Sequence, residues 1–211
     1  MLQSDSDATE LSPVVTAIRL DISRLTAPKV LGLHLYLTER AEEGATAWAD
    51  DGEEAKDIKV SGFADAAPAL GLPAGTPVVL ALERASDQVK VFLVDFSAAT
   101  NVLGKYGGDP LRFDTLGGYT ATKAALTKAG ISVARKVSVL DTGLIDDEVA
   151  PKVAGWKGSD KQEGVAVLNQ CVLALGSDND FGFGDDQSSL SVVHLSKCLK
   201  PLYAELRKQQ G

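Results

Sequence analysis

Carboxylate and amide side chains gather in one short segment of this sequence. Asp178, Asn179 and Asp180 come directly after an apolar run and are followed by Gly182. Carboxylate and amide oxygens are the hard ligands that Ca²⁺ prefers, and a glycine lets the backbone fold around an ion. The same residues are typical of an Asx-turn loop that holds no ion, and spacing alone favours that alternative. A calcium site and a plain turn are therefore competing interpretations of this segment.

Two further charged clusters border apolar runs. Lys161 and Glu163 precede a short apolar segment. A glutamate in that position can coordinate a cation or act as a general acid or base, and its plain alternative is a polar strand entry. Glu83 and Arg84 close another apolar run, where a structural ion pair is the favoured interpretation.

Other reactive side chains are few. The sequence has no Gly-x-Ser-x-Gly, Walker or Gly-x-Gly-x-x-Gly motif. Cys171 and Cys198 are the only cysteines, and His34 and His194 the only histidines, which excludes a zinc site and a histidine-rich metal cluster. One disulfide bridge and two free thiols are both open alternatives, and the sequence favours small apolar core residues.

Charge and composition exclude several classes of protein. The 211 residues include 21 Lys and Arg against 29 Asp and Glu, for a net charge of −8. This acidic balance argues against nucleic acid as a partner, because such binders need a basic surface. No apolar stretch approaches the roughly 20 residues of a membrane span. The polar, acidic start lacks the features of a secretory signal, so we expect a cytosolic protein, a mature form or a fragment.

The elements that would position these clusters are mainly β-strands, because apolar residues recur with a period of two. About eight strands are expected, in the ranges 16–23, 31–37, 77–84, 88–96, 132–141, 164–168, 171–175 and 189–195. The segment 57–63 is compatible with another short strand. The segment 88–96 is apolar on both faces and should be buried on both sides. Short helices are expected over 119–129 and 197–210. Hairpin order without βαβ alternation predicts an all-β sandwich, barrel or propeller.

The order of these segments resembles one family. The resemblance is carried by the strand that ends at Glu83-Arg84, the run 89–102, the run 130–136, the segment Asp160-Lys161-Gln162-Glu163-Gly164, and Asp178-Asn179-Asp180-Phe181-Gly182. Together they look like the C-terminal part of the phytase-like β-propeller family, described as having esterase-like activity of phytase. The resemblance is densest from Pro77 to Gly184.

This resemblance implies a fold and a domain organisation. It implies a propeller of four-stranded blades, of which this chain holds only two to three antiparallel blades and a short C-terminal helix. The division expected is a flexible N-terminus over 1–12, a propeller portion over 13–196 and a helical tail over 197–211. The missing part of the propeller would then be a partner. Family members are mostly exported, which implies a secreted or periplasmic protein.

The resemblance also implies a site and an activity. Related propellers hold Ca²⁺ in acidic loops and hydrolyse phosphate esters. Carried over by position, Glu163 and Asp178 are the candidate catalytic residues, and Arg84 and Lys161 the candidate substrate-binding residues. Candidate metal ligands are Glu83, Asp178, Asn179 and Asp180. The substrate would be a small ester or phosphate ester, although no basic pocket for phytate is evident. A non-catalytic propeller that serves as an interaction or binding module is the alternative.

Overall fold

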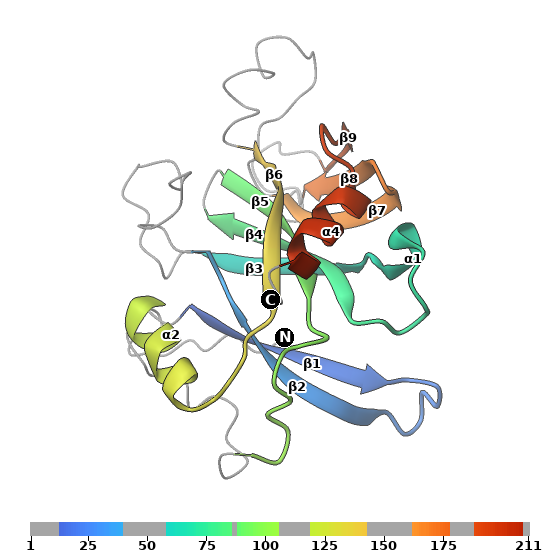
Figure 1. Ribbon diagram of the computed structural model, residues 1–211. Helices are drawn as coiled ribbons and strands as arrows, with labels where there is room; N and C mark the ends of the chain where they lie inside the picture. Colours follow the sequence, from blue (N-terminus) through green and yellow to red (C-terminus); the bar gives the residue numbers. More distant parts are fainter. Residues whose placement is uncertain are drawn as a thin grey trace.

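The computed structural model describes residues 13–39, 58–85, 88–105, 119–142, 162–177 and 188–208 (Figure 1). Strands dominate this part of the chain, as the period-two pattern predicts. In chain order the elements are β1 Val14–Asp21, β2 Lys29–Leu37, β3 Lys59–Asp65, α1 Ala67–Leu70, β4 Val78–Ala85, β5 Gln88–Asp95, α2 Tyr119–Lys128, β6 Arg135–Asp141, β7 Gln162–Asn169, β8 Val172–Ser177, β9 Ser189–His194 and α4 Leu199–Lys208.

The described strands form three antiparallel sheets. One sheet pairs β1 with β2, the second has the order β3-β4-β5-β6, and the third has the order β7-β8-β9. The prediction of a β-rich chain built from antiparallel hairpins, with a short C-terminal helix, is therefore confirmed. Neither a closed barrel nor a ring of blades is formed by the described residues, so the propeller stays a prediction.

Strand β5 of the central sheet is apolar on both faces except at Lys90, as predicted from its alternation. Val89, Val91 and Leu93 face one core, and Phe92 and Val94 face another; all five side chains are buried. The first core is completed by residues of β8, α1 and α4, including Leu173, Leu175, Leu70 and Leu199. Sandwiching the central sheet between two apolar layers removes most of its side chains from water, which is the main favourable term in folding.

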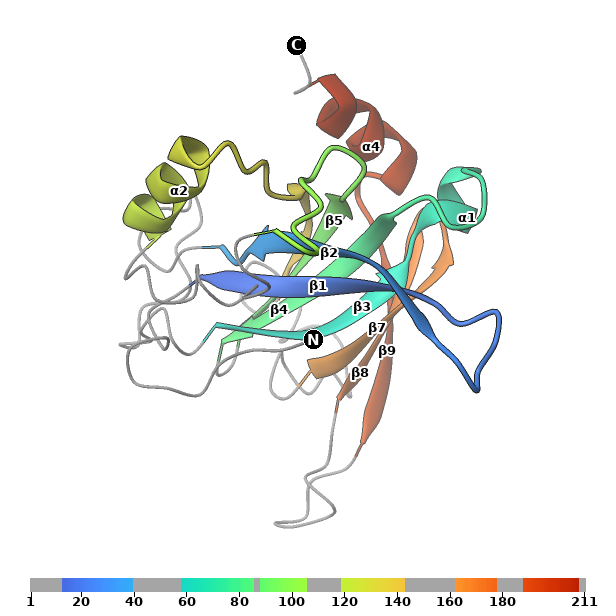
Figure 2. The same cartoon turned by 90° about the horizontal axis from the view of Figure 1, so that it is seen from below.

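The hairpin β1–β2 forms the layer on the other face. Val15 and Tyr36 pack against Phe92 and Val94 in the second core. The opposite face of the same hairpin packs against α2, where Leu35 and Leu126 belong to a third apolar cluster. Figure 2 shows β1 crossing β3 and β4 at an angle, as twisted sheets do when they pack face to face.

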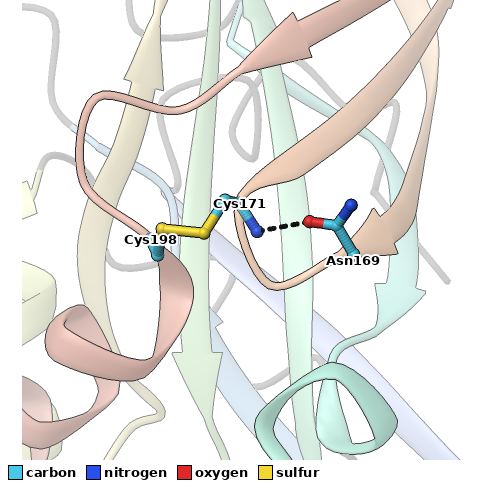
Figure 3. The surroundings of a disulfide bond; sticks show 3 residues. All are labelled: Asn169, Cys171 and Cys198. Atoms are coloured by element: carbon cyan, nitrogen blue, oxygen red, sulfur yellow. Dashed lines mark hydrogen bonds between the residues drawn. A yellow bond between two sulfur atoms is a disulfide. The ribbon is translucent and has the colours of Figure 1, made fainter.

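A disulfide bridge fastens α4 to the turn between β7 and β8. Cys171 and Cys198 are bonded (Figure 3), so the prediction of two free core thiols is wrong. The backbone brings them together, because the Leu199 N–H donates to the Gln170 carbonyl oxygen at 2.7 Å. The Asn169 side chain also accepts from the Cys171 N–H at 2.8 Å, which shapes the turn. Neither sulfur is a free thiol that could act as a nucleophile.

The C-terminal helix packs into the first core. Leu199 and Leu202 of α4 belong to that core, and Leu206 of the same helix is also buried. These residues recur at roughly one helical turn, which is the apolar stripe expected of a helix that covers a sheet. The segment predicted as a helical tail is thus helical, and its apolar face contacts the core.

Two predicted boundaries need correction near the candidate site. Strand β7 begins at Gln162, which pairs with Ser177, so Glu163 lies inside the strand and does not precede it. The turn between β7 and β8 consists of Gln170 and Cys171, one residue later than the two positions left between the predicted strands 164–168 and 171–175. The antiparallel pairing with β8 extends the strand beyond the apolar residues that the sequence pattern detects.

Candidate functional site

Arg84 and Glu163 form an ion pair between the central sheet and the three-stranded sheet. Arg84 Nη2 lies 3.1 Å from Glu163 Oε1, and the two side chains are 22% and 44% exposed. Glu163 stands next to the start of β7, and Arg84 is the penultimate residue of β4. Two residues that the sequence predicts as site residues, 79 positions apart by their numbers, are therefore in direct contact.

Strands β3 and β7 lie close together, which brings Glu163 within reach of Arg84. A Cβ atom placed on Gly62 of β3 would lie 3.4 Å from the Glu163 carbonyl oxygen, the short end of ordinary van der Waals contact. Lys59 pairs with Arg84 in the β3–β4 register, so β3 joins the end of β4 to the start of β7. The glycine at position 62 leaves room for the two backbones at this corner.

The end of β8 lies at the same corner. Gln162 pairs with Ser177, the last residue of β8, and Glu163 follows Gln162 in the chain. Ser177 Oγ and Ser189 Oγ lie 2.7 Å apart, which ties the ends of β8 and β9 together. The described structure thus brings Arg84, Glu163 and Ser177, which precedes Asp178 in the chain, into one region. Of the other predicted site residues, Lys161, Asp178, Asn179 and Asp180 lie outside the described residues.

Glu83 points away from this corner. Successive side chains of a strand face opposite sides of the sheet, so Glu83 and Arg84 cannot share a partner directly. The favoured interpretation of an ion pair is right in kind, because both residues are paired, but not with each other. Glu83 is fully buried, and its Oε1 lies 2.6 Å from Lys136 Nζ on β6.

Both carboxylate oxygens of Glu83 are occupied by donors. The Tyr36 hydroxyl donates to Oε1, alongside Lys136, and the Glu39 backbone N–H donates to Oε2 at 2.7 Å. Lys136 Nζ lies 4.2 Å from the centre of the Phe92 ring, a cation–π distance. A metal ion bound by Glu83 would have to displace Lys136 or the tyrosine hydroxyl. The described contacts are those of a structural ion pair.

Burial acts against the positive charge of Lys136 in this network. Desolvation lowers the pKa of Lys136 below its usual value, and the Glu83 carboxylate opposes that shift. A buried ammonium is costly unless a carboxylate and hydrogen bonds compensate it. Glu83, Tyr36 and the Phe92 ring together supply that compensation.

A second buried lysine lies in the same layer. Lys90 of β5 is 1% exposed, and its Nζ lies 2.7 Å from Glu39 Oε2 and 3.7 Å from Asp141 Oδ2. The hairpin register places Lys90 directly opposite Glu83. Sequence reasoning missed this network. A signal was available, since Lys90 interrupts an otherwise apolar strand on the same face as Phe92 and Val94.

The chemistry available to the described residues is therefore concentrated at the Arg84–Glu163 corner. Glu163 is a half-exposed carboxylate beside a guanidinium that can bind an anion with its planar fork. Within the described ranges, no group of three or more His, Cys, Asp or Glu side chains could hold a metal ion. The predicted Ca²⁺ site, whose acidic segment is outside these ranges, stays a prediction.

Comparisons add no relative to this picture. No family model, curated protein or solved structure matches the chain. Among the described helices, none is long and apolar enough to cross a membrane.

Proposed function

We propose that this chain is a portion of a phytase-like protein that hydrolyses phosphate esters with the help of Ca²⁺. The observation that carries the proposal is the contact between Arg84 and Glu163 at the corner where β8 also ends. Two residues chosen from the sequence for their chemistry, Arg84 and Glu163, meet there although they are far apart along the chain, and Ser177 at the end of β8 pairs with the neighbour of Glu163. The fold proposed for the whole protein is the β-propeller implied by the family resemblance.

Arg84 and Glu163 have complementary roles in this proposal. A substrate phosphate competes with Glu163 for the guanidinium of Arg84, because both are anions that fit its fork. Glu163 is then free to act as a general acid or base beside the bound ester. Asp178, Asn179 and Asp180 are the proposed ligands of Ca²⁺. When bound, Ca²⁺ would neutralise charge on the phosphate and lower the pKa of a bound water molecule.

Two features support an exported, incomplete propeller. A disulfide between Cys171 and Cys198 is typical of proteins in oxidising compartments, which supports a secreted or periplasmic location. The three-stranded sheet also exposes large apolar side chains, with Leu168 and Val192 each 56% exposed and Leu190 74% exposed. Exposed apolar side chains on a sheet favour contact with a further structural layer. We propose that the rest of the propeller supplies it.

Hydrolysis of p-nitrophenyl phosphate, measured with added Ca²⁺ and with a chelator, tests this proposal. We expect Ca²⁺-dependent turnover that falls about 100-fold or more in Glu163→Gln, the usual scale of general acid–base catalysis. Arg84→Lys keeps the charge but loses the fork, so we expect a raised KM. Glu205→Gln is the matched control, because Glu205 is 48% exposed and pairs only on the surface, with Lys197.

Calorimetric titration with Ca²⁺ separates the metal from the chemistry. The full chain should bind Ca²⁺, and Asp178→Asn should weaken binding while Glu205→Gln leaves it unchanged. Full hydrolytic activity in Glu163→Gln would contradict the proposed role of that residue. The absence of both Ca²⁺ binding and turnover would contradict the enzyme.

A non-catalytic binding module is the second candidate. One observation favours it: Glu83 and Arg84, two of the predicted site residues, already have ion-pair partners. In that case the charged residues stabilise the contact between strands and the function lies in binding another molecule. Loss of stability in Glu163→Gln, with no hydrolysis by the unaltered chain, would be the result expected of this candidate.

A further inference from the structure

A cavity of about 350 Å³ lies between the β1–β2 hairpin and the central sheet. Strand β1 is buried at its Val14–Thr16 end, whereas its residues 18–20 are exposed. The hairpin therefore diverges from the central sheet as β1 runs toward Asp21. Two twisted sheets that cross at an angle diverge in this way, and the crossing is visible in Figure 2. Val79 of β4 lines the cavity. Glu83 is not among the lining residues, because it lies four residues further along the same face of β4, roughly 13 Å away.

Aromatic rings form the inner wall of this cavity. Phe63 and Phe96 meet edge to face, with ring centroids 6.3 Å apart and planes at 80°. The His34 ring also packs on Phe96, with ring centroids 6.0 Å apart. All three side chains line the cavity, and Phe63 is still 36% exposed. Partly exposed aromatic rings that are fixed by their neighbours offer a preformed surface to a flat apolar molecule.

One cation stands at the mouth of the cavity. The Arg19 side chain lines it and makes a hydrogen bond to the Gly75 carbonyl oxygen at 3.3 Å, which is long for such a bond. No ion pair of Arg19 is formed with the described residues. Asp65 also lines the cavity, but its Oδ1 already accepts from the Ala67 N–H at 2.9 Å. The guanidinium is therefore the charged group with the most unused hydrogen-bonding capacity at this mouth.

The charge of the wall agrees with this assignment. Burial is the main cause that lowers the pKa of His34 below its usual value, and the positive charge of Arg19 contributes to the same shift. The imidazole is thus neutral near pH 7, and Arg19 supplies the positive charge.

We propose that this cavity binds a small aromatic molecule with an anionic group, whose ring contacts Phe63 and Phe96 and whose anion pairs with Arg19. The volume of about 350 Å³ is at the lower end of known ligand pockets, which suits one or two fused rings. This site is separate from the Arg84–Glu163 corner and is independent of the proposed hydrolase activity.

Calorimetric titration of the full chain with 1-naphthoate and its uncharged analogue 1-naphthamide tests the proposal. We expect saturable binding of the acid and about tenfold weaker binding of the amide, since loss of one charge-assisted contact is worth about 1.4 kcal/mol. Arg19→Gln should remove this preference. Arg24→Gln, an exposed arginine on the same hairpin that does not line the cavity, should keep it.

A cavity-filling variant locates the bound ring. Ala17 lines the cavity, so Ala17→Leu should abolish binding of both compounds while circular dichroism shows a folded protein. The proposal is overturned by any of three results: no saturable binding below about 1 mM, equal affinity for the acid and the amide, or unchanged binding in a folded Ala17→Leu variant. Equal affinity combined with loss in Ala17→Leu would leave a purely apolar cavity, which is not what we propose.

Discussion

Removal of the Cys171–Cys198 bridge should destabilise the protein by several kcal/mol. The bridge joins two residues with a sequence separation of 27 and so restricts the unfolded chain. Without it the unfolded chain gains conformational entropy, which should lower the free energy of unfolding by about 3.5 kcal/mol. The perturbation we choose is the double variant Cys171→Ala and Cys198→Ala. It avoids leaving a single reactive thiol.

The structure indicates which part of the fold responds first. The bridge ties the start of α4 to the β7–β8 turn, and α4 contributes Leu199 and Leu202 to the core between the central and the three-stranded sheets. Without the bridge, α4 is held by its apolar contacts and by the Leu199 N–H bond to Gln170. Detachment of the helix would expose that core, so unfolding should begin there.

Urea unfolding followed by far-ultraviolet circular dichroism measures this effect. With a slope of about 2–3 kcal/mol per molar urea for a chain of this size, we expect the midpoint to fall by roughly 1–2 M in the double variant. A reductant should shift the unaltered protein by a similar amount and leave the double variant unchanged. The reasoning is refuted if the two proteins unfold within about 0.5 kcal/mol of each other, or if the purified, oxidised protein has two titratable thiols.

Three further predictions concern the hairpin β1–β2 and the buried network. Gly32→Ala should cost about 1–3 kcal/mol by urea unfolding, because the added Cβ would lie 2.8 Å from His34 Nε2, whereas Gly176→Ala, with nothing within 4 Å, should cost almost nothing. The unfolded chain binds a proton near pH 6.5 that His34 in the folded protein, with its lowered pKa, takes up only at lower pH. The free energy of unfolding should therefore fall as the pH drops below 6.5. Urea unfolding at several pH values should show a smaller fall in His34→Gln than in the unaltered protein. Glu83→Gln should destabilise by about 3 kcal/mol, since it leaves the Lys136 ammonium without its carboxylate; the added change Lys136→Met should recover part of this loss, and failure to do so would contradict the coupling.

Local pattern was sufficient to predict most of the elements. The alternation in β5 predicted burial of both its faces, and Val91 and Phe92 indeed belong to two different cores. Strand and helix positions follow from a backbone periodicity that each segment carries within itself. Boundaries shifted where pairing extended a strand past its apolar residues, as at Gln162 opposite Ser177.

Part of the site was also visible in the sequence. Glu83 and Arg84 close an apolar run and Glu163 precedes another, which is visible in the sequence, and the structure places all three in ion pairs. Their partners could not be predicted from spacing. Lys136 is 53 positions from Glu83, and its contact depends on β6 joining the edge of the sheet beside β5.

The sequence by itself determined which segments are strands, which faces are apolar and where charge interrupts them, because these properties depend on a repeat of two residues. Tertiary structure alone decided that Arg84 meets Glu163, that Cys171 bonds to Cys198 and that β1 leaves a cavity beside Phe63. Those contacts depend on how whole sheets pack and cross. The packing minimises the exposed apolar area of all layers together, and no single segment encodes it.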